Sequence, residues 1–482
     1  MFNWATRLLT FIGLRRFEAA ETDRLNVAHW SNTGGDQNIN AALDVDLPTL
    51  RDRTIYEAEN NPYLAGVIRT HKGDVVGAHG PSLQIQSDSS DYNDALEEMW
   101  SQWSESPAIT GDVSLVELLQ QDIGMLWMCG EFLDQLVSEP GDGNGVNLRI
   151  NPIHPRRLGN PATSSSNPLL QMGVERLPNG KVTRYWIEDF LSDQGQSVSY
   201  GHKPYDAKEI IHGFERFEPG QVRGIPLAAP ALPAIAEIRD YDTAVRRAVR
   251  VAAEFGVLLH SNHPDIQPIV VNETVKMEGG VIRTCPPGWM PTQIKPEHPQ
   301  QNYREFHNEQ LRSIGRAVNM PLMMVMLDSG DANYSAARFN AQLYNRGTQS
   351  LQAWLTRIKL RRVFAEFQSE ASLLAKIAKP KQVSLQWTWP VAPHVDPEKE
   401  AAAIQLLMEM KLLSEFEAAA MLGRDYEATL KLMKRAAELR ESLGVDGNQP
   451  AEQKADEIAK AQRAVADIMA RSVSENIFTV TL

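Results

Sequence analysis

The stretch NMPLMMVMLDSGDANYSAARFN, residues 319–340, decides how this chain folds. It opens with a methionine-rich apolar run, breaks into the small, acidic and turn-forming residues DSGDAN, and then resumes as a helix-forming sequence. Either Asp331 or Asn333 is suited to cap that helix. The stretch therefore predicts a loop between two rigid helices, which is either a catalytic loop or a mobile finger. Apolar residues at helical spacing predict a buried stripe on the second helix, made of Phe339, Leu343, Leu351, Trp354, Leu355 and Ile358.

Two helices separated by an insert precede this stretch. Residues 232–255 are rich in alanine and have a high helical propensity throughout. The sequence YREFHNEQLRSIGRAV, which ends at residue 318, predicts the second helix. Residues 257–302, which lie between them, contain β-forming runs and prolines. We expect this part to be a small, separately folded insert.

The first 225 residues predict an α+β region. Residues 20–46 are polar and weakly periodic, and we expect them to form a loose lead-in. From Leu50 two helical stretches follow, joined at ENNPY, where Asn61 can cap a helix and Pro62 can occupy its first turn. Helices and strands then follow, with EPGDGNG and LPNG as hairpin-type turns.

The C-terminal part predicts one strand and several amphipathic helices. The strand is VSLQWTW, and the helices are interrupted at Leu413–Ser414 and at Gly423. The tail after Gly444 is polar and rich in Ala, Gln and Lys, and we expect it to be frayed or helical only on contact.

Composition excludes several classes of protein. A chain of 482 residues with 43% hydrophobic residues has enough apolar mass for roughly two to four cores. Its net charge of −13 argues against tight, static binding of nucleic acid, because such binding depends on basic patches that neutralise phosphates. Cys129 and Cys285 occur in no zinc-ligand spacing and indicate no disulfide.

The N-terminal sequence MFNWATRLLTFIGLRRF lacks the order of regions found in a signal peptide. No apolar run approaches the ~20 residues that span a bilayer. We expect a cytoplasmic protein with an amphipathic N-terminal arm that docks on a partner or stays flexible.

Catalytic and cofactor motifs give weak signals. No phosphate-binding GxxxxGK[ST] loop or GxSxG elbow occurs, and Arg338 stands where a serine–lysine dyad beginning at Ser335 would need its lysine. Asp328 and Asp331 could hold a divalent ion, although the same residues are typical of turns and helix caps. We predict no metal or cofactor. The remaining alternatives are a metal-dependent nucleic-acid-processing enzyme that uses these aspartates and a helical scaffold or adaptor.

Three arginines on the Ala-rich helix have two interpretations. Arg246, Arg247 and Arg250 are either a solvated helix face or part of a surface that faces DNA.

Several motifs in one order give the chain a resemblance to the portal proteins of lambda-like tailed bacteriophages. RTIYEAENNPYLAGVIRTHKGDVVGAHGPSLQ resembles the family's early helix followed by a Val-Val-Gly turn. EIIHGFERFEPGQVRGIPLAAPAL is similar to its Pro-Gly-Gln and Arg-Gly-x-Pro region, and NYSAARFNAQLYNRG resembles its Asn-Tyr-Ser signature. The matched motifs extend from about residue 50 to 445.

The resemblance implies a portal fold of the α+β class, with an α/β wing, a two-helix stem, an α/β clip insert, a long wing helix and a helical crown. The implied tunnel loop would contain Asp328, Ser329, Gly330, Asp331, Ala332 and Asn333. The implied boundaries are 1–48 for the N-terminal arm, 49–225 and 334–395 for the wing, 226–256 and 302–317 for the stem helices, 257–301 for the clip, 318–333 for the tunnel loop, 396–444 for the crown and 445–482 for the tail.

The resemblance also implies an assembly without catalysis. Members form a ring, commonly a dodecamer, at one capsid vertex of the virion, and double-stranded DNA passes through its channel. The implied partners are the terminase large subunit, head–tail adaptor proteins and the major capsid protein, with assembly in the cytoplasm of the host bacterium and no insertion into a membrane.

Overall fold

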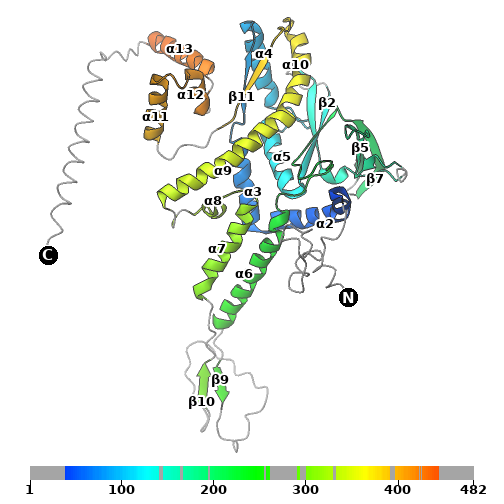
Figure 1. The fold of residues 1–482 in the computed structure, drawn as a ribbon, viewed down its shortest axis with the longest axis vertical. Coiled ribbons are helices and arrows are strands. Elements are labelled where there is room, and N and C mark those ends of the chain that lie inside the picture. Colours follow the sequence, from blue (N-terminus) through cyan, green and yellow to red (C-terminus); the bar gives the residue numbers. More distant parts are fainter. Residues whose placement is uncertain are drawn as a thin grey trace, which may run out of the picture. The chain divides into compact units, whose positions relative to one another are not determined.

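A computed structural model describes residues 38–139, 145–162, 167–193, 196–253, 257–260, 290–293, 300–328, 330, 333–390, 397–422, 424 and 426–443. The chain forms two compact units, Met1–Ala392 and Pro393–Leu482, which are described separately. The first unit contains both helices and strands (Figure 1), as the sequence predicts for an α+β protein. No helix in the described part of the chain has an apolar run long enough to cross a bilayer.

A three-stranded antiparallel sheet forms the centre of the first unit, with the strand order β3-β2-β8. Helix α5 leads directly into β2 through Gly130, whose φ of 81° gives the left-handed turn that ends the helix. A Cβ atom on Gly130 would lie 2.2 Å from the backbone carbon of Ile225, so only glycine fits. The bounds are α5 Leu115–Cys129, β2 Glu131–Ser138, β3 Leu148–Ile153 and β8 Ile210–Phe214.

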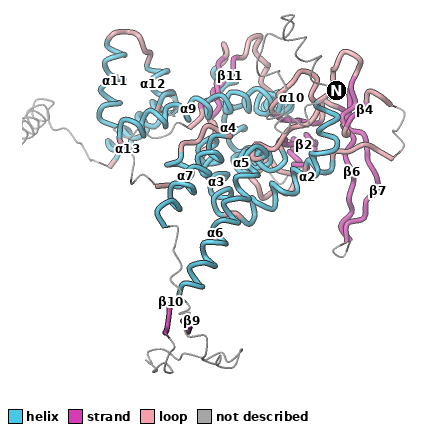
Figure 2. The backbone as a smooth tube through the Cα atoms, turned by 60° about the horizontal axis from the view of Figure 1, so that its bottom comes forward, coloured by secondary structure: helices cyan, strands magenta, loops and turns pink. Residues whose placement is uncertain are grey.

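The described strands form three further sheets. Strands β6 and β7 form a long hairpin (Figure 2) in a four-stranded antiparallel sheet of order β4-β5-β6-β7. The sequence did not predict β7, whereas the predicted LPNG turn does join β5 to β6. The bounds are β1 Ser82–Gln86, β4 Leu170–Gln171, β5 Val174–Arg176, β6 Val182–Asp193, β7 Gln196–Asp206, β9 Val257–His260, β10 Met290–Gln293 and β11 Ser384–Thr388; β1 pairs with β11, and β9 with β10.

Helices α2 and α3 meet at the predicted cap. The Asn61 side chain accepts hydrogen bonds from the backbone of Tyr63 and Leu64, and Pro62 is the first residue of α3. The bounds are α2 Ile39–Asn60, α3 Pro62–Val76 and α4 Ser90–Ser104.

The predicted loose lead-in is wrong for its last residues, because α2 begins at Ile39 and continues through Pro48. Leu43 and Leu47 of this helix are buried in a core formed with the two larger sheets. Burial of these side chains outweighs the poor local helix signal. Residues 1–37 lie outside the described part of the chain.

A long helix closes the main core. It consists of α9 (Tyr334–Leu355), a π-helical turn (Thr356–Leu360) and α10 (Arg361–Ala375). The core beneath it is aromatic, and Trp100 contacts the rings of Trp103, Phe364, Phe367 and Trp387.

The predicted apolar stripe on this helix is correct for only part of its length. Leu355 is buried, and Leu351, Trp354 and Ile358 pack against the core. By contrast, Phe339 is 60% and Leu343 is 44% exposed. From Ser335 onward, Tyr344 is the first described side chain of α9 that is buried in this core, so the predicted burial of the stripe is wrong for Phe339 and Leu343.

The helix–insert–helix pattern is confirmed in its two helices. They are α6 (Leu232–Ala253) and α7 (Gln300–Arg316), which lie side by side (Figure 1). A short helix, α8 (Leu322–Met326), follows. Most of the insert, including Cys285 and His263, lies outside the described residues.

The second unit contains three described helices: α11 (Pro397–Glu409), α12 (Glu415–Met421) and α13 (Tyr426–Ser442). Both predicted interruptions, at Leu413–Ser414 and at Gly423, fall between these helices. Ser414 and Glu417 form a capping box at the start of α12, which explains the first interruption. Residues 444–482 lie outside the described part.

Candidate functional site

The two-helix hairpin α6–α7 is fixed to the first unit by apolar packing. Ile235 and Ile238 of α6 are buried with Leu311 and Ile314 of α7 in the main core. The other end of α6 is solvent-exposed, and Val249 is 49% exposed. The hairpin is therefore anchored at one end and free of the core at the other.

A polar and aromatic cluster lies where the hairpin meets helix α3. Asp242 of α6 accepts a hydrogen bond of 2.7 Å from the Tyr303 hydroxyl of α7. The Nε2 atom of His307 lies 3.7 Å from the same carboxylate, and the His307 ring contacts Tyr63 of α3 edge to face. Burial, together with this hydrogen bond and the charge of Asp242, raises the pKa of Tyr303 to about 12. The cluster fixes the relative position of three helices.

The segment predicted as the tunnel loop, 318–333, divides into two parts. Its first part is packed, because α8 lies within it, Met320 and Val325 are buried, and the Val325 side chain lies against Gly315 of α7. From Leu327, which is 80% exposed and has a φ of 50°, the chain leaves the core. The exposed part of the segment is thus shorter than predicted and begins at Leu327.

The described residues of this exposed part make the predicted turn and cap. Asp328 Oδ1 accepts a hydrogen bond from the Gly330 amide, and the Asn333 side chain caps α9 by accepting one from the Ser335 amide. Ser329, Asp331 and Ala332 lie outside the described residues.

Of the two residues of the alternative metal site, Asp328 belongs to the described part of the chain and Asp331 does not. Asp328 uses one carboxylate oxygen for the turn at Gly330. Over the described ranges, no group of three His, Cys, Asp or Glu residues could hold a metal ion.

The three arginines of α6 are all exposed. Arg246 lies 3.9 Å from the carboxylate of Asp242, one turn earlier on the same helix. Helical spacing places Arg246, Arg247 and Arg250 within one side of α6. They form an exposed basic surface along the hairpin.

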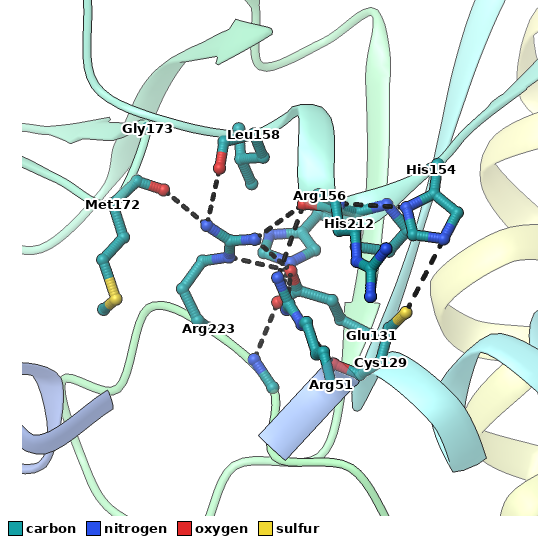
Figure 3. A network of polar contacts seen from close by, with 12 residues as sticks. Arg51, Cys129, Glu131, His154, Arg156, Leu158, Met172, Gly173, His212 and Arg223 are labelled. Atoms are coloured by element: carbon teal, nitrogen blue, oxygen red, sulfur yellow. Dashed lines mark hydrogen bonds and ion pairs between the residues drawn. The ribbon is translucent and has the colours of Figure 1, made fainter. Parts of the chain in front are cut away.

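A buried carboxylate, Glu131 of β2, connects three parts of the first unit (Figure 3). These are the segment before α6 that contains Arg223 and Gly224, the neighbouring strand β8, and helix α2. Its Oε1 atom accepts hydrogen bonds of 2.6 Å from Arg51 and 2.8 Å from Arg223. Its Oε2 atom accepts a bond of 2.7 Å from the Gly224 amide and lies 3.1 Å from His212 Nε2. Burial alone would raise the pKa of Glu131, but Arg223 and Arg51 hold it well below its usual range.

Sequence reasoning missed this network. Arg223 belongs to the quoted Arg-Gly-x-Pro motif, and Arg51 lies two residues before the quoted early-helix motif. Glu131 is 80 residues from Arg51 and 92 residues from Arg223. The available signal was Glu131 itself, a charged residue at the start of a largely apolar strand. This signal indicates that the charge needs a partner but does not identify the partner.

A second buried ion cluster fixes the long helix to the sheet. Lys359, within the π-helical turn, places its Nζ atom 2.5 Å from Asp122 of α5 and 2.8 Å from Asp134 of β2. Burial and the neighbouring Asp134 raise the pKa of Asp122, whereas the two carboxylates raise the pKa of Lys359 despite its burial. This cluster connects α9, which begins at the loop, to the centre of the first unit.

We expect Lys359→Met to lower the free energy of unfolding by roughly 3–5 kcal/mol, because it leaves two buried carboxylates without a cation. Denaturant unfolding would measure this. Lys381→Met, at an exposed lysine of the same unit, serves as the control and should change stability by less than roughly 0.5 kcal/mol. Adding Asp122→Asn and Asp134→Asn to Lys359→Met should restore part of the loss. An unchanged midpoint in Lys359→Met would contradict the role of the cluster.

Comparison with known proteins finds a match to a portal protein family and a related portal protein. Residues 24–352 match the family described as phage portal protein, lambda family. A probable portal protein of Halomonas phage phiHAP-1 is 21% identical over 443 residues, which are 85% of this chain and 84% of that protein.

Two solved structures are also similar. The neck of an empty gene transfer agent particle has a TM-score of 0.47 at 17% identity, covering 79% of this chain and 94% of that one. An HK97 family phage portal protein from Corynebacterium diphtheriae has a TM-score of 0.31 at 12% identity, covering 73% and 98% of the respective chains. The family match extends over most of the first unit, with its hairpin and its buried Glu131 network, and the chain therefore belongs to the lambda family of phage portal proteins.

Proposed function

We propose that this portal protein forms a closed ring, a dodecamer, at one vertex of a phage capsid in the virion, and that double-stranded DNA passes through its channel. The α6–α7 hairpin, anchored at one end and followed directly by α8 and an exposed turn, carries this proposal. A closed ring needs one head-to-tail contact that repeats. The exposed Phe339 and Leu343 of α9 support such a contact, since a neighbouring copy would remove them from water.

The proposed division of the chain keeps the boundaries that the family resemblance implies, with two changes at packed helices. In this proposal residues 39–225, 318–326 and 334–395 form the wing, 226–256 and 302–317 the stem, 257–301 the clip, 396–444 the crown and 445–482 the tail. We restrict the tunnel loop to 327–333, because α8 and the buried Val325 belong to the packed wing. We likewise propose an N-terminal arm of residues 1–38 in place of 1–48, because Leu43 and Leu47 of α2 are packed into the core of the wing.

The channel surface is formed by the loop and the stem. Residues 327–333 point into the channel, and Arg246, Arg247 and Arg250 line the stem. Turn-forming and acidic residues allow the loop to change conformation beside DNA without binding phosphates tightly. The net charge of −13 is consistent with DNA that slides through the ring.

The energy for packaging comes from a partner. The clip docks the terminase large subunit and later the head–tail adaptor proteins, whereas the wing contacts the major capsid protein and the crown lies inside the head. We expect no ATPase or nuclease activity from the purified chain with magnesium or manganese. Phosphate release and DNA cleavage assays would check this, and turnover that disappears in Asp331→Ala would instead favour the metal-dependent enzyme.

The ring itself has a direct test. Native mass spectrometry of the purified protein should give a dodecamer of this 53.8 kDa chain, roughly 650 kDa, because closed point-group assemblies have defined copy numbers. Negative-stain images should show rings with a central channel. A monomer at all concentrations and salt conditions would contradict the proposal and favour a scaffold or adaptor.

A further inference from the structure

Helix α13 carries an apolar stripe that the described residues leave uncovered. Leu432, Leu439 and Leu443 are 66%, 58% and 67% exposed, and Ala436 between them is exposed as well. Their spacing of i, i+4, i+7 and i+11 places all four on one side of the helix. Most of the stability of a helix in a protein comes from packing of its apolar face, so this stripe requires a partner.

The packing within the described second unit uses other residues. Phe416 of α12 contacts Tyr426 of α13 edge to face, at 4.7 Å between ring centroids. Among the described residues of this unit, the buried apolar side chains are Ile404 of α11 and Ala418 of α12. The stripe on α13 therefore remains available for a further helix.

The sequence that directly follows α13 has the features of such a helix. Residues 444–450, GVDGNQP, begin with glycine, which commonly ends a helix, and finish with proline, which commonly opens one. The next residues, 451–473, are rich in Ala, Glu, Gln, Lys and Arg. Apolar residues recur in this segment at a spacing of three and four. They predict one apolar stripe formed by Ile458, Ala461, Val465 and Ile468.

We propose that residues 451–473 form an amphipathic helix that folds back antiparallel onto the α13 stripe of the same chain. A connection of seven residues is within the usual range for two antiparallel helices. If Leu443 lies opposite Ala451, the same register brings Leu439 opposite Ala455 and Ala436 opposite Ile458. In each of these pairs a large side chain meets alanine, which is the alternation that lets helix faces interdigitate.

A second copy of the chain is the competing occupant of the stripe. The tail has the advantage of being connected to α13, because a short linker gives an effective concentration on the order of millimolar. Against a copy free in solution at micromolar concentration, the tail therefore occupies the stripe first. This inference does not depend on assembly of the ring.

A disulfide tests the register. We expect Ala436→Cys with Ile458→Cys to form an intrachain disulfide under mild oxidation, identified by peptide mass mapping in a Cys285→Ser background. Ala436→Cys with Ile468→Cys is the matched control, since ten further helical residues displace the second sulfur by roughly 15 Å. Equal cross-linking in both pairs, its absence from both, or a disulfide between two chains would overturn the proposal.

Hydrogen exchange tests whether residues 451–473 cover the α13 stripe. Amides in the second half of α13 should exchange at least tenfold faster in a chain ending at residue 444 than in the full chain. Ala451→Asp, Ala455→Asp and Ile458→Asp together, at the positions that the register places opposite Leu443, Leu439 and Ala436, should reproduce this loss. Ala459→Asp, Ala466→Asp and Ala470→Asp add the same charge away from the stripe and should leave the protection intact.

The outcomes distinguish this proposal from the ring. Unchanged α13 protection in the truncated chain would show that another surface covers the stripe and would overturn the inference. Absence of the roughly 650 kDa species in the full chain, with α13 still protected from exchange, would contradict the ring and leave this inference standing.

Discussion

Replacing Glu131 by glutamine is expected to lower the free energy of unfolding by roughly 3–5 kcal/mol, one of the largest effects available in this chain. The change removes the negative charge between Arg51 and Arg223, whose side chains remain buried. It also places a donor NH₂ group where the carboxylate accepts four contacts, so at least one buried donor loses its acceptor. Denaturant unfolding followed by circular dichroism would measure the loss.

Glu139→Gln is the matched control, because that glutamate is exposed and lies just after the same strand. A change of less than roughly 0.5 kcal/mol is expected there. Equal midpoints for wild type and Glu131→Gln would mean that the network contributes nothing to stability. Loss of the fold in Glu131→Gln would agree with the prediction. The milder Arg51→Lys, which keeps the positive charge but loses the planar guanidinium donors, should then give a folded protein of intermediate stability.

The same residue gives a pH dependence of known sign. The pKa of Glu131 in the folded chain lies well below the ordinary value of 4.5. Its contribution is therefore fully present above that ordinary value and is lost as the pH falls through the lowered pKa. The stability difference between wild type and Glu131→Gln should be constant from pH 7 down to about pH 5 and should shrink in more acidic solution. A difference that grows with acid would contradict the assignment.

Removal of residues 329–332 from the proposed tunnel loop is expected to reduce DNA packaging at least tenfold and to leave ring assembly unchanged. The deletion retains Asp328 and Asn333, because Asn333 caps α9 and its loss would cost roughly 1 kcal/mol for a reason unrelated to the channel. Turn residues without large apolar side chains contribute little buried area, so the fold and the ring should tolerate the deletion.

An equal deletion of residues 163–166, the polar sequence TSSS of the first unit, provides the control. Mass measurement and negative-stain imaging would establish ring assembly, and a packaging assay with terminase would measure function. Normal packaging by intact rings would remove any channel role for the loop. Missing rings in the loop variant, with intact rings in the control, would make the loop an assembly element.

The sequence by itself determined the features that depend on neighbours along the chain. Asn61 and Pro62 identified the start of α3 because a side-chain acceptor and a fixed φ act within one turn. Leu413–Ser414 marked the break before α12 because the Ser414 side chain caps that helix within one turn. The order of short motifs was sufficient to indicate the portal family, which the match over residues 24–352 confirms.

Only the tertiary structure decided which side chains meet. Lys359 pairs with Asp122, 237 residues earlier, and nothing in the sequence around either residue names the other. Burial likewise separated Leu355, which lies in the core, from Phe339 on the same predicted stripe. Helix periodicity shows which residues share a face, but the length over which that face is covered depends on elements remote in sequence. Buried charges and the ends of packed surfaces are therefore set by long-range contacts, because their energies depend on partners that the local sequence does not contain.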